Sequence, residues 1–252
     1  MSLTRKEIES YLAVVDKVDR NKQNAIRVLL ENDRIEKCKE SFIFFASQMW
    51  PVFISGKHHQ IMADAFERVA AGKLKRLIIN MPPRHTKSEF ASFLLPAWFL
   101  GKFPEKKIIQ TAHTAELATG FGRKVRNLVQ SDVYGKVFDT KLSTDSKAAG
   151  RWNTHMGGDY FAIGVGGAVT GKGADLLIID DPHSEQEAKQ GNPAVFDSVY
   201  EWYTSGPRQR LQPGGAIIIV MTRWSKRDLT GQILKNAGKD GVDQWEVIDF
   251  PA

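Results

Sequence analysis

Cysteine is almost absent from this sequence, because Cys38 is the only one among 252 residues. A single thiol can form neither an intrachain disulfide nor a cysteine-based metal cluster. Long apolar runs are absent too: the longest, residues 93–100, contains Pro96 and is far shorter than the ~20 residues of a membrane-spanning helix. The charged N-terminal residues lack the apolar segment of a secretion signal. These absences predict an intracellular protein with no membrane partner.

Internal repeats and low-complexity linkers are also missing, which favours one large α/β domain, alone or with a small appendage. Hydrophobic residues make up 42% of the chain and charged residues 25%, a balance that is ordinary for a globular protein with a buried core. The formal net charge is +6. That excess of basic residues permits a polyanionic partner but does not require one.

Residues 76–89 combine a buried strand, a polar turn and the start of a helix. In this layout Lys87 reaches the terminal phosphates of a nucleotide and the Ser88 hydroxyl holds Mg²⁺. The template G-x-x-x-x-G-K-[ST] has two glycines, and here Met81 and Thr86 replace them. The segment therefore predicts a phosphate-binding (Walker A) loop, with an ordinary basic turn as the alternative.

A second motif follows a glycine-rich loop at residues 164–173, which we expect to be mobile or sharply turning. The apolar run at 176–179 ends in two acids, Asp180 and Asp181. In P-loop nucleotidases the first such acid (Walker B) holds Mg²⁺ and the next polarises the attacking water. The alternative is a helix N-cap with a solvated neighbour. The order of the two motifs favours a nucleotide site.

The rest of the chain alternates between helical and strand patterns, which predicts a mostly parallel sheet covered by helices. Residues 3–48 are expected to be helical and to pack on this core. Further strands are expected at 106–111, 216–222 and 245–250, a hairpin at 150–165, and helices at 57–69, 90–100, 115–129, 184–190, 193–203 and 228–236.

Two polar residues outside the motifs are candidate contacts for the nucleotide. The amide of Gln60 can both donate to and accept from an adenine edge, although a surface glutamine is an equal alternative. Thr222 is at the end of the strand expected at 216–222, where a hydroxyl can sense the γ-phosphate and transmit its loss.

These residues together resemble the large terminase subunit of tailed bacteriophages, the ATPase that drives DNA into empty capsids. The matching segments are the WP aromatic cluster with His59 and Gln60, PPRHTKSE, TGKGADLLIIDDP and MTRW. The resemblance covers residues 42–250. It implies an α/β fold of the P-loop NTPase class (ASCE, RecA-like), with a mostly parallel central sheet and an N-terminal helical layer.

The resemblance also implies the working context. ATP and Mg²⁺ would be the cofactors, and the partners would be double-stranded DNA, a homo-oligomeric ring on a portal, and the small terminase subunit. The protein would act in the host cytoplasm and not as a virion component. Residues 1–50 would form the N-terminal helical segment and 51–252 the ATPase core. Large terminases carry a nuclease domain that does not fit in this length, so we expect a truncated chain.

The resemblance implies roles for individual residues. Arg84 would sense phosphate, Thr222 would couple hydrolysis to movement, and Gln60 would contact adenine. Lys172 is similar in position to groups that complete a neighbour's site, with Arg151 as a second candidate. The class usually carries Glu where Asp181 stands, so Glu185 or Glu187 could substitute. The loop residues expected around the nucleotide are Pro83, Arg84, His85, Thr86, Lys87 and Ser88.

Two other functions fit the same residues. One is a helicase-like nucleic-acid translocase ATPase, which would need a second motor domain. The other is a nucleotide-binding module whose loop is vestigial, as the replaced glycines at Met81 and Thr86 suggest.

Overall fold

The structure is a computed structural model that describes residues 4–14, 20–190, 192–237 and 243–251. Its centre is one sheet with the strand order β3-β4-β5-β2-β6-β7-β1-β8. The six strands from β5 to β8 in this order are parallel, whereas the hairpin β3-β4 is antiparallel and lies at one edge. In chain order the strands are β1 (Arg76–Asn80), β2 (Lys107–Ala112), β3 (Leu142–Ala148), β4 (Arg151–Thr154), β5 (Asp159–Gly164), β6 (Ala174–Asp180), β7 (Leu211–Met221) and β8 (Glu246–Asp249).

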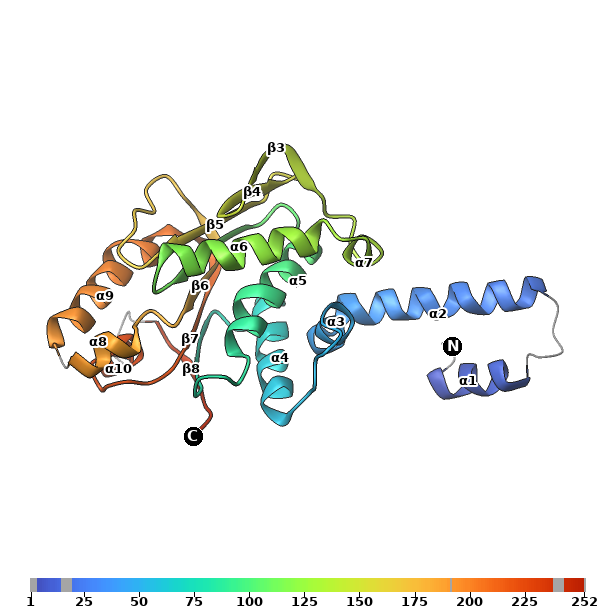
Figure 1. Cartoon of the computed structure of the whole chain (residues 1–252), viewed down its shortest axis with the longest axis horizontal. Helices are drawn as coiled ribbons and strands as arrows, with labels where there is room; N and C mark the ends of the chain where they lie inside the picture. Colours follow the sequence, from blue (N-terminus) through green and yellow to red (C-terminus); the bar gives the residue numbers. More distant parts are fainter. Residues whose placement is uncertain (1–3, 15–19, 191, 238–242, 252) are drawn as a thin grey trace.

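Helices cover both faces of the sheet (Figure 1). They are α1 (Arg5–Val14), α2 (Arg20–Glu40), α3 (Phe42–Met49), α4 (Lys57–Ala70), η2 (Glu89–Leu94), α5 (Leu95–Lys102), α6 (Ala115–Val129), α7 (Asp132–Gly135), α8 (Glu185–Gln190), α9 (Pro193–Ser205), η3 (Pro207–Arg210) and α10 (Leu229–Asn236). The mostly parallel, helix-covered sheet expected from the alternating pattern is confirmed.

Alternation along the central strands sends side chains into two separate cores. Leu77 and Ile79 of β1 join the core under α3, α4, α5 and α6. Ile78, between them, joins the opposite core with residues of α9 and α10. A parallel strand that is covered on both faces needs apolar residues at every position. For this reason these strands are continuous hydrophobic runs in the sequence.

The N-terminal helices differ in how closely they pack. Phe42 of α3 is fully buried against Phe66, Phe90 and Trp98, and the Trp98 indole donates to the Cys38 carbonyl at 2.9 Å. The rest of α2, together with α1, extends away from the sheet (Figure 1). The expected packing of the N-terminal segment is thus found for α3 and the C-terminal end of α2.

One local prediction needs refinement and another is confirmed. The helix expected over 90–100 is divided into the π-helix η2 and the α-helix α5; π-helical turns are rare and are frequently found at functional sites. The glycine-rich segment 164–173 turns sharply, with Gly166 and Gly171 at φ of 80° and 74°, values that favour glycine.

Among the described residues, no helix is both long and apolar enough to cross a membrane.

Candidate active site

The predicted phosphate loop connects β1 to the helix that begins at Lys87. Arg84 and Thr86 both adopt left-handed backbone conformations, with φ of 65° and 63°. Residues other than glycine pay a steric cost in this region. The loop therefore has at position 86 the conformation for which the template uses glycine, although a threonine stands there.

The Lys87 side chain is 6% exposed and points to the ends of two neighbouring strands. Its ammonium lies 2.8 Å from Oδ2 of Asp181 and donates to Oγ1 of Thr222 at 3.1 Å. The Thr222 amide in turn donates to Oδ1 of Asp181 at 2.7 Å. These three residues, expected from separate segments, form one hydrogen-bonded cluster.

Ser88 and Asp180, the two predicted Mg²⁺ ligands, are in direct contact. The Ser88 hydroxyl donates to Oδ1 of Asp180 at 2.9 Å, and the Ser92 hydroxyl donates to Oδ2 at 2.7 Å. Burial, followed by repulsion from Asp181, raises the pKa of Asp180 to about 7. A cation beside this carboxylate would relieve both effects.

The contact between Ser88 and Asp180 fits a magnesium ion. Mg²⁺ prefers oxygen ligands and is commonly held by one or two protein groups together with phosphate oxygens and water. A hydroxyl and a carboxylate beside a buried lysine provide this donor set. In the described part of the chain, no group of three or more His, Cys, Asp or Glu residues could hold a metal.

The sheet topology explains why distant segments meet here. Strand β7 lies between β1 and β6 and places Thr222, just after its end, between the phosphate loop and the two acids. All three strands are parallel, so their carboxyl ends share one edge of the sheet. Ligands of open α/β sheets bind in the crevice at this edge.

The remaining loop residues lie at the surface of the turn. Pro83, Arg84 and His85 are exposed, and a His85 ring nitrogen, Nδ1, donates to the Pro83 carbonyl at 2.8 Å. Gln60 is exposed in the first turn of α4, and its neighbour His59 contacts Thr86. Gln60 therefore directly follows, in the chain, a residue that contacts the phosphate loop. Its contact with adenine stays a prediction.

Lys172 is not part of this cluster. Its ammonium lies 2.7 Å from Oδ2 of Asp159 and its side chain is 13% exposed; it also lies over the ring of Phe161, 4.9 Å from the centroid. Arg151, on β4, is exposed. To complete the site of a neighbouring subunit, the Lys172 side chain would first have to leave its ion pair with Asp159. The Arg151 side chain is already at the surface.

The alternative carboxylates lie outside the Lys87 cluster. Glu185 is exposed and forms an ion pair with Lys189 at 2.6 Å. Glu187 accepts from the Ser184 amide at 3.0 Å and lies 3.6 Å from His113. Of the three candidates, Asp181 is the one that touches Lys87 and Thr222.

Sequence reasoning missed two residues of the site. Ser92 was expected only as part of a core helix, and its signal was a lone hydroxyl inside the apolar run after Phe90. In the sequence His59 is only the neighbour of Gln60 in a segment that resembles the terminase family, with no role of its own. Its contact with Thr86 depends on how α4 packs beside the loop, which no local pattern shows.

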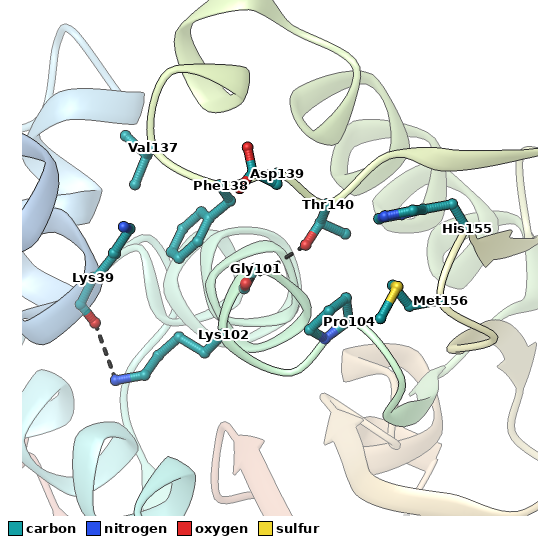
Figure 2. Close-up of a pocket in the computed structure, with 10 residues that line it drawn as sticks. All are labelled: Lys39, Gly101, Lys102, Pro104, Val137, Phe138, Asp139, Thr140, His155 and Met156. Carbon is teal, nitrogen blue, oxygen red and sulfur yellow. Dashed lines mark hydrogen bonds between the residues drawn. The ribbon is translucent and has the colours of Figure 1, made fainter.

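A separate surface pocket of about 450 Å³ lies near the end of α5 (Figure 2). Its lining includes Lys102, whose ammonium donates to the Lys39 carbonyl at 3.0 Å, and Thr140, which donates to the Leu100 carbonyl at 3.0 Å. Because α5 ends just before β2 begins, this pocket lies at the amino edge of the sheet. The candidate active site is at the opposite, carboxyl edge.

Comparisons with known proteins identify the fold. No family model and no curated protein sequence matches the chain. Solved structures do match. The large terminase of bacteriophage HK97 matches with 13% identity and a TM-score of 0.54, and the match covers 81% of this chain and 41% of the HK97 chain. The large terminase ATPase domain of Thermus phage P74-26 matches with 13% identity and a TM-score of 0.50, over 82% of this chain and 84% of that domain.

The fold is therefore that of a P-loop NTPase, as expected. More specifically, the structures it resembles are phage large terminase ATPase domains, which confirms the resemblance seen in the sequence. The chain spans less than half of the HK97 protein.

Proposed function

We propose that this chain is a Mg²⁺-dependent ATPase whose hydrolysis of ATP drives double-stranded DNA into a viral capsid. The observation that carries the proposal is the cluster of Lys87, Ser88, Asp180, Asp181 and Thr222 at the carboxyl ends of three adjacent parallel strands. The similarity of the fold to terminase ATPase domains supports the packaging role.

In this function the loop from Pro83 to Ser88 surrounds the phosphates. Backbone amides and the N-terminal end of the following helix favour negative charge there. The exposed Arg84 senses the γ-phosphate, and Gln60 contacts the adenine edge.

Ser88 and Asp180 would hold Mg²⁺, and the ion would supply positive charge beside the phosphate oxygens. Lys87 stabilises the charge that develops during in-line attack, and Asp181 orients the attacking water. Because Lys87 contacts Asp181, an incoming γ-phosphate competes with this carboxylate for the ammonium. Movement of Lys87 to the phosphate frees Asp181 to accept a hydrogen bond from water.

In this proposal Thr222 transmits the exchange. Its hydroxyl accepts from Lys87 and its amide donates to Asp181. A change in either partner alters the hydrogen bonds at the end of β7 and so reaches the chain that follows. These two hydrogen bonds support the coupling role of Thr222.

The proposal includes a larger assembly in the host cytoplasm. Residues 1–50 form an N-terminal segment and residues 51–252 the ATPase core. Subunits form a ring on a portal, with a small terminase subunit as a further partner. Arg151 or Lys172 completes the site of a neighbouring subunit.

The test is ATP turnover with and without double-stranded DNA. K87A should lower turnover to background, and unchanged turnover would refute the assignment of the site. DNA should stimulate the wild-type protein, and the stimulation should weaken as salt rises because phosphate contacts release counterions. Turnover that DNA does not affect would leave an ATPase but contradict the packaging role.

A further inference from the structure

The phosphate loop has a threonine where its backbone requires the left-handed conformation. Thr86 has φ of 63°, and a β-branched side chain is among the least suited to this region. A loop with glycine here would adopt the conformation at no steric cost. Some other contact must therefore favour it in this chain.

The contact comes from His59, in the first turn of α4. Its Nε2 lies 2.6 Å from Oγ1 of Thr86. The amide of Gly56 donates to Nδ1 of the same ring at 2.9 Å, so Nδ1 is the acceptor and Nε2 carries the proton. The Thr86 hydroxyl donates in turn to the His85 carbonyl at 2.6 Å. A directed chain of hydrogen bonds thus runs from Gly56 to the phosphate loop.

The imidazole is held so that its donor stays aimed at Thr86. Its ring lies 4.9 Å from that of Phe53 and 4.6 Å from that of Phe90, centroid to centroid, and the residue is 5% exposed. Burial, with a contribution from His58, lowers the pKa of His59 to about 4. The ring is therefore neutral at physiological pH, as the acceptor role of Nδ1 requires.

We propose that His59 is a positioning residue that holds the phosphate loop in its nucleotide-binding conformation and so compensates for the threonine at position 86. The inference rests on the proposed function, because it takes the loop to be the phosphate site. It assigns to α4 a structural role in nucleotide affinity that is separate from any contact with the base.

The first test does not involve nucleotide. The amide of Phe90 donates to the Thr86 carbonyl at 3.0 Å, so its hydrogen exchange reports the order of the loop. H59F keeps an aromatic ring in the cluster but removes the donor, and exchange at Phe90 should become about tenfold faster, the equivalent of one hydrogen bond. H59Q supplies an amide donor of similar reach and should restore slow exchange. The amide of Phe103, bonded to the Phe99 carbonyl, is the control and should not change.

The second test is a double-mutant cycle on the affinity for Mg²⁺ and a non-hydrolysable ATP analogue, measured by calorimetry. H59F should weaken binding about tenfold in the wild-type background. In the T86G background the same change should weaken it less than about twofold, because glycine adopts the left-handed conformation unaided. A role for His59 in core packing alone would give equal losses in both backgrounds.

The outcomes separate the two proposals. Suppose that the wild type binds nucleotide and H59F weakens binding equally in the wild-type and T86G backgrounds. This result, or unchanged hydrogen exchange at Phe90 in H59F, would overturn the role of His59 without contradicting the proposed ATPase function. If the wild type binds no nucleotide while H59F still loosens the loop, the proposed function fails and the contact with Thr86 keeps only an ordering role.

Discussion

The Ser88 hydroxyl donates a hydrogen bond to Oδ1 of Asp180 at 2.9 Å, although the two residues are 92 positions apart in the chain. Ser88 ends the phosphate loop and Asp180 ends the acidic strand, so this contact joins the two motifs into one site. It also brings together two oxygens suited to Mg²⁺.

Removing either oxygen should raise the Mg²⁺ concentration needed for nucleotide binding. We expect S88A to raise it about tenfold, as loss of a group that binds or orients at a metal site commonly does, and D180N to raise it further. S92A, which removes only a hydrogen bond to the carboxylate, should have a smaller effect. The measurement is a Mg²⁺ titration of analogue binding; equal requirements in S88A and wild type would contradict the ligand assignment.

Asp180 should make stability fall as pH rises. Its folded-state pKa is raised to about 7, above the value near 4 in an unfolded chain. Between these values the folded state binds more protons than the unfolded state, so the free energy of unfolding decreases as pH increases. D180N lacks this titration and should gain stability relative to wild type between pH 5 and pH 8, without added Mg²⁺.

Chemical denaturation of both proteins at the two pH values checks this prediction. Because the buried histidines titrate in both proteins, the difference between wild type and D180N isolates Asp180. A difference that does not vary with pH would mean that the carboxyl group titrates at its ordinary value.

Asp181 should be required for turnover but not for nucleotide binding. Asn is among the residues that tolerate positive φ, and Asp181 has φ of 38°, so D181N should keep the backbone. A positioned proton acceptor contributes about 10²–10⁴ in rate, and kcat should fall in this range while the Kd for an ATP analogue changes only a few-fold. E187Q and E185Q are matched controls, and a comparable loss of kcat in either would move the role to that residue.

Lys172 and Arg151 should differ in their effects on stability. Lys172 and Asp159 are 13% and 17% exposed, so K172A leaves a largely buried carboxylate without its partner and should cost about 1–3 kcal/mol. Arg151 is exposed, and R151A should change the free energy of unfolding by less than about 0.5 kcal/mol. Thermal or denaturant unfolding distinguishes them.

Subunit mixing then identifies the residue that completes a neighbour's site. If this residue is Arg151, R151A should lose turnover, and mixing it with K87A should restore part of it, because each variant supplies what the other lacks. Recovery with K172A in place of R151A would assign the role to Lys172. Full turnover in both single variants would exclude both residues.

Much of the fold could be predicted because its signals are local. The apolar runs that became β1, β6 and β7 are continuous because the sheet is covered on both faces, and their polar ends placed Lys87, Asp180 and Thr222 near one edge. The course of η2 could not be predicted in this way: its π-helical turns lie in an apolar segment that looks like an ordinary helix, and they bring Ser92 to Asp180.

The sequence by itself determined the class of fold and the chemistry available at the phosphate loop, because strand patterns, turns and the identities of Lys87 and Ser88 depend only on neighbouring residues. Only the tertiary structure decided which carboxylate faces Lys87, that Lys172 pairs with Asp159, and that His59 supports Thr86. These contacts join distant segments, and their geometry follows from the insertion of β7 between β1 and β6 and from the packing of α4 beside the loop. No local pattern records either of these.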